Sequence, residues 1–392
     1  MKVLMIVPLV SRDGAFGGPV AVAIEQAQAL RRNGEEVTLA AGWDGRPIGL
    51  KPSGTLNIRL FRCLRIAPGL TGLVSLGLVL YAFMNLRKFD AVHIHAGRDL
   101  ISCSVLVAVR MTRTKVVIQT HGMIMPDARS LVRALDRVLI RRALGAARCV
   151  IVLTETEAAG IRAVASSATI ERLPNGISAG VAQGAKRDDD LVAFISRLHP
   201  RKNLRVFLEA AAIVSEQRER TVFEFYGPDE GSLADGLQFI ADNPSVNVRY
   251  GGALTREGVI EVLTRASVFV LPSEGEVFPM AVLEALAAGA VPVVSDSCGI
   301  ASDLEKFRAA VLVDSTPEAV STGVLHVMSS RTSRERLVRG GRAALQDWLD
   351  IDRIARELIN LYRGAPTTSR DFSNVGLSGE GAVGGRSSDG SV

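Results

Sequence analysis

Two carboxylates, Glu276 and Glu284, stand eight residues apart after the apolar run Val268–Leu271. Glu276 lies in the turn after this predicted strand. Glu284 lies in a helix that we expect to begin at Pro279, because proline is favoured at the first helical position. A strand, a turn and a helix N-terminus form a common anion site. Carboxylates beside it accept hydrogen bonds from hydroxyls, so a ligand with phosphates and hydroxyls, such as a nucleotide-sugar, fits. The alternative is a helix cap and a solvated glutamate.

Two cations follow another predicted strand. Arg197 and Lys202 lie in the loop after Leu191–Ile195, just before a helix. Guanidinium and ammonium groups donate hydrogen bonds to a pyrophosphate and offset the charge that develops on a leaving nucleotide. An ordinary solvated basic loop is the alternative, and Arg201 is the weaker candidate of the three cations.

The carboxylate segment resembles the E-x7-E motif of the retaining glycosyltransferases of family 4, the group 1 type, which have two Rossmann-like domains. The matching residues are Ser273, Glu276, Phe278, Pro279, Glu284 and Ala285. Val277 replaces the usual glycine of that motif. The cationic loop resembles the family's Arg-x4-Lys-Gly motif, with Asn203 in place of the glycine. The resemblance extends over roughly residues 1 to 363.

This resemblance implies a GT-B fold, in which two Rossmann-like domains face each other across a cleft and a C-terminal helix crosses back to the first domain. It implies that Arg197 and Lys202 hold the pyrophosphate, that Glu276 holds donor-sugar hydroxyls and that Glu284 holds the ribose. His121, which follows the predicted strand Val116–Gln119, matches a histidine that reaches the donor sugar. Further donor-binding positions are Gly17, Gly18, Gly227, Phe278 and Pro279.

Apolar strand-like runs alternate with helix-length amphipathic segments, which predicts parallel sheets covered by helices on both faces. The runs are Val3–Val7, Val37–Ala40, Ile58–Phe61, Ala91–Ile94, Val116–Gln119, Val150–Leu153, Leu191–Ile195, Val222–Phe225, Val246–Tyr250, Val268–Leu271, Val291–Val294 and Ala310–Val313. We expect an N-terminal acceptor-side domain over 1–176, a nucleotide-sugar-binding domain over 190–349, a cross-over helix over 350–364 and a disordered tail over 365–392. Ligands of such sheets bind at the carboxyl ends of strands, hence in the cleft.

Basic residues concentrate in the first half of the chain. Up to Asn175 there are 23 lysines and arginines against 12 aspartates and glutamates, about +11, while the whole chain carries +5. Such a half favours an anionic partner. In the predicted helix 129–144, four arginines recur at every fourth residue and share one face, as a solvated surface or as a contact with anionic lipid or an acceptor's pyrophosphate. They are Arg129, Arg133, Arg137 and Arg141.

The segment Ile66–Leu86 carries no charge and is long enough to span a bilayer. It also contains one proline and three glycines, and it lies between two predicted strands of one sheet. We therefore expect a buried or partly exposed helix, with a membrane-contacting or spanning helix as the alternatives. The four cysteines form no C-x-x-C pair, which is typical of reduced thiols in a cytosolic protein. The N-terminal apolar run is too short for a signal peptide.

These observations predict a retaining hexosyltransferase that moves a sugar from a UDP- or GDP-sugar to a hydroxyl of a glycan or lipid-linked acceptor, in cell-surface or exopolysaccharide synthesis. We expect a cytoplasmic protein, with peripheral contact to the inner face of the plasma membrane. We expect no cofactor and no metal: Asp188–Asp190 precedes a strand, and His93 and His95 share one strand face without an apparent third ligand.

Other functions remain open at this level. A sugar-nucleotide epimerase has the same fold, whereas a phosphorylase needs a cofactor lysine that we do not find. A non-catalytic membrane- or nucleic-acid-binding protein could use the basic half. Aromatic residues make up only 5% of the chain, which argues against a nucleic-acid surface.

Overall fold

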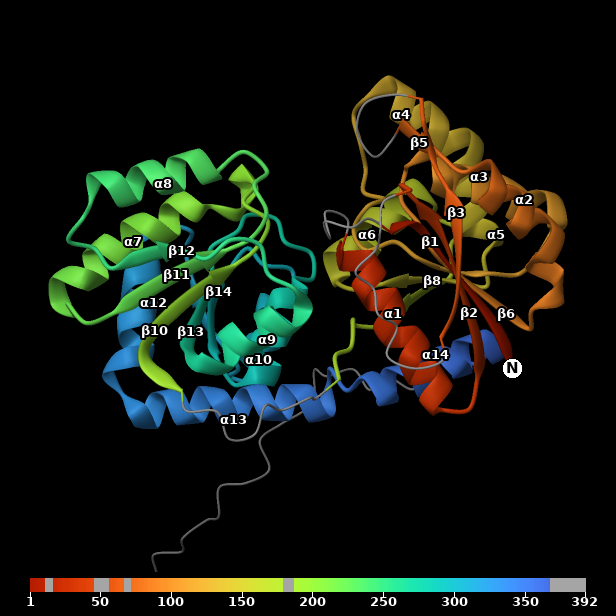
Figure 1. Cartoon of the computed structure of the whole chain (residues 1–392). Helices are drawn as coiled ribbons and strands as arrows, with labels where there is room; N and C mark the ends of the chain where they lie inside the picture. The colour runs from red at the N-terminus through yellow and green to blue at the C-terminus, as the bar shows by residue number, and fades with distance from the viewer. Residues whose placement is uncertain (11–16, 46–55, 67–71, 179–186, 367–392) are drawn as a thin grey trace, which may run out of the picture.

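The computed structural model describes residues 1–10, 17–45, 56–66, 72–178 and 187–366 (Figure 1). Residues 179–186, which lie between the two expected domains, and residues 367–392 of the predicted tail lie outside the described residues. Two parallel sheets dominate the fold, and the predicted α/β class with two Rossmann-like domains is confirmed. Each of the strand-like runs in the sequence coincides with a strand of one of these sheets.

The first domain is built on a seven-stranded sheet of order β3-β2-β1-β6-β7-β8-β9. Its paired strands are all parallel. The strands are β1 Lys2–Val10, β2 Glu36–Trp43, β3 Asn57–Arg62, β6 Ala91–His95, β7 Val117–Gln119, β8 Cys149–Val152 and β9 Ile170–Arg172. The helices are α1 Gly17–Arg32, α2 Leu76–Asn85, α3 Leu100–Thr112, α4 Ser130–Leu135, α5 Arg141–Ala146 and α6 Glu155–Val164.

The second domain has a six-stranded parallel sheet of order β12-β11-β10-β13-β14-β15. The strands are β10 Asp188–Ile195, β11 Val222–Tyr226, β12 Val248–Tyr250, β13 Ala266–Leu271, β14 Val291–Ser295 and β15 Val311–Val313. The helices are α7 Leu204–Gln217, α8 Leu233–Asp242, α9 Arg256–Arg265, α10 Met280–Ala288, α11 Ala301–Lys306, α12 Pro317–Ser329 and α13 Arg331–Asp347. Strands such as β13 are buried throughout, because helices cover both faces, so β13 is apolar at every position except Ser267.

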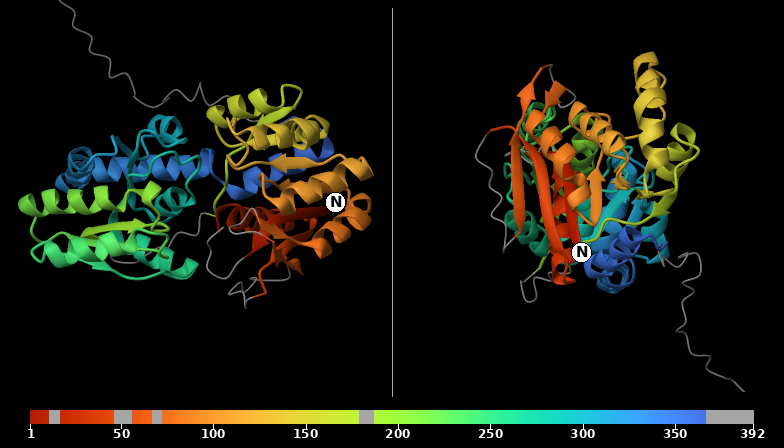
Figure 2. Two further views of the ribbon diagram at one scale, coloured as in Figure 1. Left: turned by 90° about the horizontal axis from the view of Figure 1, so that it is seen from above. Right: turned by 90° about the vertical axis from the view of Figure 1, so that its right-hand side faces the viewer.

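The last helix, α14, spans Ile351–Arg363 and belongs to the first domain in space. Ile354 and Leu358 are fully buried in the same core as Val3 and Met5 of β1. Seen from above, the chain runs from under the second domain back to the first (Figure 2). The predicted return of a C-terminal helix is therefore confirmed.

Several local predictions need correction. The helix predicted over 129–144 contains a π-helical turn, Asp136–Ile140, between α4 and α5. Arg129 lies before α4 and bonds Asp127, so only three of the four arginines lie within helical structure. Pro279 is the N-cap of α10 and not its first residue. The helix α1 begins at Gly17, so the Gly17-Gly18 pair forms its first two residues.

The described part of the uncharged segment, residues 66 and 72–86, forms no spanning helix. It contributes β5 Leu73–Val74, which pairs antiparallel with β4 Leu64–Arg65 just before the segment, and the ten-residue α2. None of the helices in the described residues is long and apolar enough to cross a membrane. The pair β4–β5 and the edge strand β9 were not predicted, because strands of two or three residues are too short to carry a periodic signal.

Candidate active site

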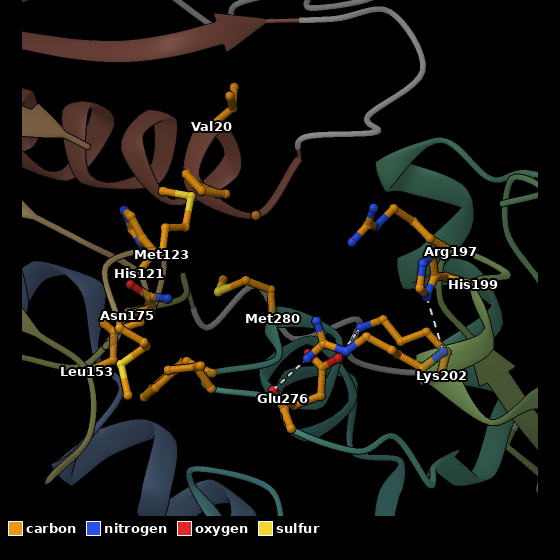
Figure 3. Close-up of a pocket in the computed structure, with 18 of the residues that line it drawn as sticks. Val20, His121, Met123, Leu153, Asn175, Arg197, His199, Lys202, Glu276 and Met280 are labelled. Atoms are coloured by element: carbon orange, nitrogen blue, oxygen red, sulfur yellow. Dashed lines mark hydrogen bonds and ion pairs between the residues drawn. The ribbon is translucent and has the colours of Figure 1, made fainter. Parts of the chain in front are cut away.

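A pocket of about 870 Å³ lies between the two domains, at the carboxyl ends of their central strands (Figure 3). This volume is within the range of small-molecule sites. It brings together side chains that are far apart in the sequence. The predicted site residues that line it are Gly18, His121, Arg197, Lys202, Glu276 and Phe278.

The second-domain wall of the pocket is charged. Arg197, just after β10, forms an ion pair of 2.8 Å with Glu230. Lys202 ends the 3-10 helix Pro200–Lys202, and its ammonium group forms an ion pair with the Glu276 carboxylate. The side chains of this pair are 15% and 18% exposed, so the charges face the pocket but are partly desolvated.

Asn203, which stands where the family motif has glycine, adopts a left-handed conformation with φ +52°. Asparagine tolerates this conformation better than most residues with a side chain. Its amide nitrogen also donates to the Pro272 carbonyl at 3.0 Å and to the Ser315 hydroxyl at 2.9 Å. Asparagine in place of glycine therefore retains the left-handed loop conformation, and its side chain connects the Lys202 loop to the end of the strand that precedes Glu276.

Val277, the other departure from the motif, contacts the first domain. A Cβ placed on Gly122, which has φ +74°, would lie 2.6 Å from Cγ2 of Val277. The valine side chain thus fills the space beside the glycine that follows His121. The replacement puts apolar contact between the domains where the usual glycine would leave open space.

His121 projects from the loop after β7 toward the pocket (Figure 3). Its loop is held by the buried carboxylate of Glu157, which accepts hydrogen bonds from the Thr120 hydroxyl, the Gly122 amide and the Leu153 amide. His121 Nε2 lies 2.8 Å from Nδ1 of His95. Burial lowers the pKa of His121 to about 3, so the imidazole is neutral near pH 7.

His93 and His95 have structural positions in the core. Both are fully buried on β6, their rings are stacked, and His95 stacks in turn on His121. Nδ1 of His93 lies 2.8 Å from the hydroxyl of Tyr362 on α14. The described residues contain no group of three or more His, Cys, Asp or Glu side chains that could hold a metal ion.

Glu284 is not among the residues that line the pocket. It lies on α10 beside an ion pair that joins the domains, between Arg256 of α9 and the buried Glu25 of α1. The Ser178 hydroxyl also donates to Glu25 at 3.0 Å. Burial raises the pKa of Glu284 to about 7; Arg256 opposes this shift and Glu25 adds to it.

Comparison with known sequences identifies the family. The family model "Glycosyltransferase Family 4" matches residues 16–180, and the model "Glycosyl transferases group 1" matches residues 181–344. The chain belongs to the group 1 glycosyltransferases.

Two relatives illustrate this membership, and one solved structure shows the same fold. The phosphatidyl-myo-inositol mannosyltransferase of Mycobacterium tuberculosis is 28% identical over 203 residues, 48% of this chain and 53% of that protein. The UDP-Gal:alpha-D-GlcNAc-diphosphoundecaprenol alpha-1,3-galactosyltransferase of Escherichia coli is 24% identical over 293 residues, 67% of this chain and 74% of that protein. The chain spans about half the length of the curated relatives that it matches first. The Anabaena protein HepE, solved in complex with UDP, has the same fold, with a TM-score of 0.71 at 15% identity over 92% of this chain and 99% of HepE.

Three predicted donor-binding positions of this group 1 glycosyltransferase lie around the pocket. Gly227 has φ +144°, and a Cβ there would lie 1.7 Å from the Ser196 carbonyl oxygen, so glycine is needed for the close approach beside Arg197. Pro279 caps α10 directly before Met280, which lines the pocket. Gly17 opens α1, whose next residue, Gly18, lines the pocket.

The arginines of the segment 129–141 do not line the pocket of this group 1 glycosyltransferase. All four are exposed, and Arg129 forms an ion pair of 2.7 Å with Asp127. Nearby, Arg98 and Asp136 form a more buried pair at 2.8 Å, which fixes the π-helical turn against the start of α3. The surface of this segment remains a candidate for an anionic contact outside the pocket.

On the first-domain wall of the pocket, sequence reasoning predicted Gly18 and His121 but missed the apolar side chains. These include Pro8, Leu9, Val20, Met123, Met125 and Leu153. Side chains of these types have no chemical signature that separates them from core residues. His199 and Glu230, which also line the pocket, follow the predicted strands β10 and β11, and their position after strand ends was the available signal.

Proposed function

We propose that this protein transfers a sugar from a nucleotide diphospho-sugar to a hydroxyl of a glycan or lipid-linked acceptor, with retention of configuration at the anomeric carbon. One observation carries the proposal. Arg197, Lys202 and Glu276 of the second domain line the same pocket as His121 of the first domain. Cations beside a carboxylate match a ligand that has both a pyrophosphate and hydroxyls.

The hypothesised reaction uses the leaving group as the base. The bond between the anomeric carbon and the phosphate oxygen breaks, and Arg197 and Lys202 stabilise the charge that develops on the diphosphate. The acceptor hydroxyl attacks from the same face and gives its proton to the departing phosphate oxygen. Among the carboxylates that line the described pocket, Asp99 caps α3, while Glu230 and Glu276 are held in ion pairs. This supports a path without a covalent sugar–enzyme intermediate.

Donor binding would separate the Lys202–Glu276 ion pair, because each of the two side chains would bind a different part of the ligand. Lys202 turns to the phosphate and Glu276 to the sugar hydroxyls, while the neutral His121 exchanges hydrogen bonds with a further hydroxyl. Because the pair is partly desolvated, each charge gains more from such a partner than an exposed charge would. Glu284 would accept hydrogen bonds from the ribose hydroxyls only if the neighbouring ion pair between Arg256 and Glu25 rearranges.

Two relatives support the finer parts of the proposal. Their names contain a phosphatidylinositol and a diphosphoundecaprenol acceptor, and one names UDP-Gal, which favours a lipid-linked acceptor here and, of the UDP- and GDP-sugars expected from the resemblance, a UDP-sugar donor. We therefore place the protein in cell-surface or exopolysaccharide synthesis, at the inner face of the plasma membrane. We propose that it needs neither a metal ion nor a cofactor.

A ligand screen followed by a product analysis tests the proposal. UDP-, GDP- and ADP-sugars should differ in how far they raise the unfolding temperature, and the matching donor should stabilise the protein. With that donor and an acceptor, NMR of the product should show the donor's anomeric configuration, and EDTA should leave the rate unchanged. Epimerised sugar-nucleotide without acceptor would identify an epimerase, and activity that EDTA abolishes and Mg²⁺ restores would overturn the metal-free mechanism.

A further inference from the structure

The outer face of α2 is apolar although it is exposed. Four large side chains on it recur at the spacing of one helical stripe, and each is between 45% and 69% exposed. They are Leu76, Leu80, Phe83 and Met84. On the opposite side of the helix, Leu78 and Ala82 are fully buried in the core of the first domain. The helix is therefore apolar all round, which is unusual for a helix at a protein surface.

The neighbouring helix α3 repeats this pattern. Leu100, Val107 and Met111, again on one stripe, are 39%, 44% and 66% exposed, while most other positions of the helix are buried. α2 and α3 pack against each other on the flank of the first domain that faces away from the second domain (Figure 1). We call the two stripes on this packed helix pair the α2–α3 apolar face. In the described part of the second domain, only Leu237 and Ile260 are comparable, one on α8 and one on α9.

Positive charge surrounds the α2–α3 apolar face. Between Asn57 and Lys115 the sequence has nine lysines and arginines against two aspartates. Arg87, Lys88, Arg110 and Arg113 are exposed at the C-terminal ends of the two helices. Arg87 donates to the Thr112 carbonyl at 2.9 Å, which holds these ends together. On the other side of α2, the Arg59 guanidinium lies over the Tyr81 ring, 5.4 Å from its centre.

We propose that the α2–α3 apolar face docks the protein on an anionic lipid bilayer. Apolar stripes with a basic rim match the two components of such a surface, the acyl boundary and the anionic headgroups. A folded protein partner with a complementary acidic rim is the competing occupant. The bilayer is favoured because α3 begins at the pocket: its N-cap, Asp99, lines the pocket, and the next residue, Leu100, begins the α3 stripe. Docking there holds the first-domain wall of the pocket beside the membrane.

This inference deepens the proposed function, because a lipid-linked acceptor is presented at such a surface. The test is flotation of the purified full chain with vesicles of phosphatidylcholine, with and without phosphatidylglycerol. Wild type should bind the anionic vesicles and lose binding as salt rises. Leu80→Ser/Phe83→Ser should weaken the binding by at least about tenfold, because two side chains no longer enter the acyl boundary. Arg110→Gln/Arg113→Gln should weaken it roughly tenfold and reduce its dependence on salt.

The matched control is Leu237→Ser/Ile260→Ser, which makes the same kind of change on the second domain and should leave vesicle binding unchanged. Phe83→Trp adds a readout that does not rely on lost binding: its emission should shift to shorter wavelength with anionic vesicles. Equal binding by wild type and the Leu80/Phe83 variant overturns the inference. So does a wild-type dimer that this variant converts to a monomer, because the face is then a contact between copies.

Stabilisation by the donor sugar-nucleotide is measured on the same samples. If the donor stabilises wild type but vesicles are ignored at low salt, the docking surface is wrong and the proposed function stands. If vesicles bind but no sugar-nucleotide stabilises the protein, the proposed function fails and the docking surface stands.

Discussion

The two walls of the pocket differ in chemistry and in how they could be recognised. The second-domain wall carries ion pairs, between Arg197 and Glu230 and between Lys202 and Glu276. The first-domain wall is mainly apolar, with Leu9, Val20 and Met123 among its residues. The charged wall fits the part of the reaction that all nucleotide diphospho-sugar donors share, a diphosphate leaving group. The apolar side chains of the first-domain wall carry no group for a diphosphate, so we expect them to contact the acceptor, while His121 on the same wall is proposed to reach the donor sugar.

The largest expected effect comes from removing a cation of the charged wall. Lys202→Ala takes away a diphosphate contact and leaves Glu276 unpaired. We expect nucleoside diphosphate binding, measured by calorimetry, to weaken by about 2–4 kcal/mol, roughly 30- to 1,000-fold. Arg197→Ala should act in the same direction. The control Lys306→Ala removes an exposed lysine whose partner, Asp303, lies 3.5 Å away, and it should bind like wild type. Unchanged affinity in both Arg197→Ala and Lys202→Ala would place the anion site elsewhere.

Within the charged wall, Glu276→Gln separates the sugar from the phosphates. The amide keeps the shape but loses the charge that accepts hydrogen bonds from hydroxyls. Transfer should fall by at least about tenfold, while nucleoside diphosphate affinity changes little. Glu335→Gln, which changes one partner of a surface pair with Arg331 on α13, is the matched control. Wild-type turnover in Glu276→Gln would remove this carboxylate from the site.

On the apolar wall, Met123→Ser should act on the acceptor alone. We expect the KM for the acceptor to rise about fivefold, the scale of one partly buried apolar side chain, with donor affinity unchanged. Steady-state kinetics with each substrate varied in turn gives both quantities. A larger effect on donor affinity than on acceptor KM would show that the division between the two walls is wrong.

The smallest effect is expected at Glu284, beside the ion pair that joins the two domains. Glu284 has a pKa of about 7 in the folded protein against an ordinary value of 4.5. Between these values the folded protein holds a proton that the unfolded chain has lost, so the free energy of unfolding falls as pH rises from about 4.5 to about 7. Glu284→Gln cannot titrate, so its unfolding temperature should fall less over this range than that of wild type or of Glu305→Gln, a change at an exposed glutamate. Parallel pH profiles would contradict the raised pKa.

The sequence predicted what depends on neighbours along the chain. Strands buried on both faces give unbroken apolar runs, and the loops that carry Arg197, Lys202 and Glu276 follow such runs. What it missed depends on contacts between distant segments. Glu157, on α6, accepts a hydrogen bond from the loop that carries His121, and no local sequence pattern indicates this contact. The ribose role of Glu284 stays a prediction; its place beside the Glu25–Arg256 ion pair could not be read from the sequence, because that pair forms only when the domains meet.

The return of α14 to the first domain has a consequence for how the protein is made. The N-terminal sheet leaves the ribosome early, but the face that contains Val3 and Met5 is closed by side chains of α14, such as Ile354 and Leu358. The whole second domain is synthesised in between, which takes roughly 10 to 35 s at typical elongation rates. During that time the first domain has an open apolar face, whereas the second domain completes its sheet within one continuous stretch of chain. The nascent N-terminal half is therefore where we expect chaperones to bind, and a ribosome stalled before α14 would leave this half unfinished.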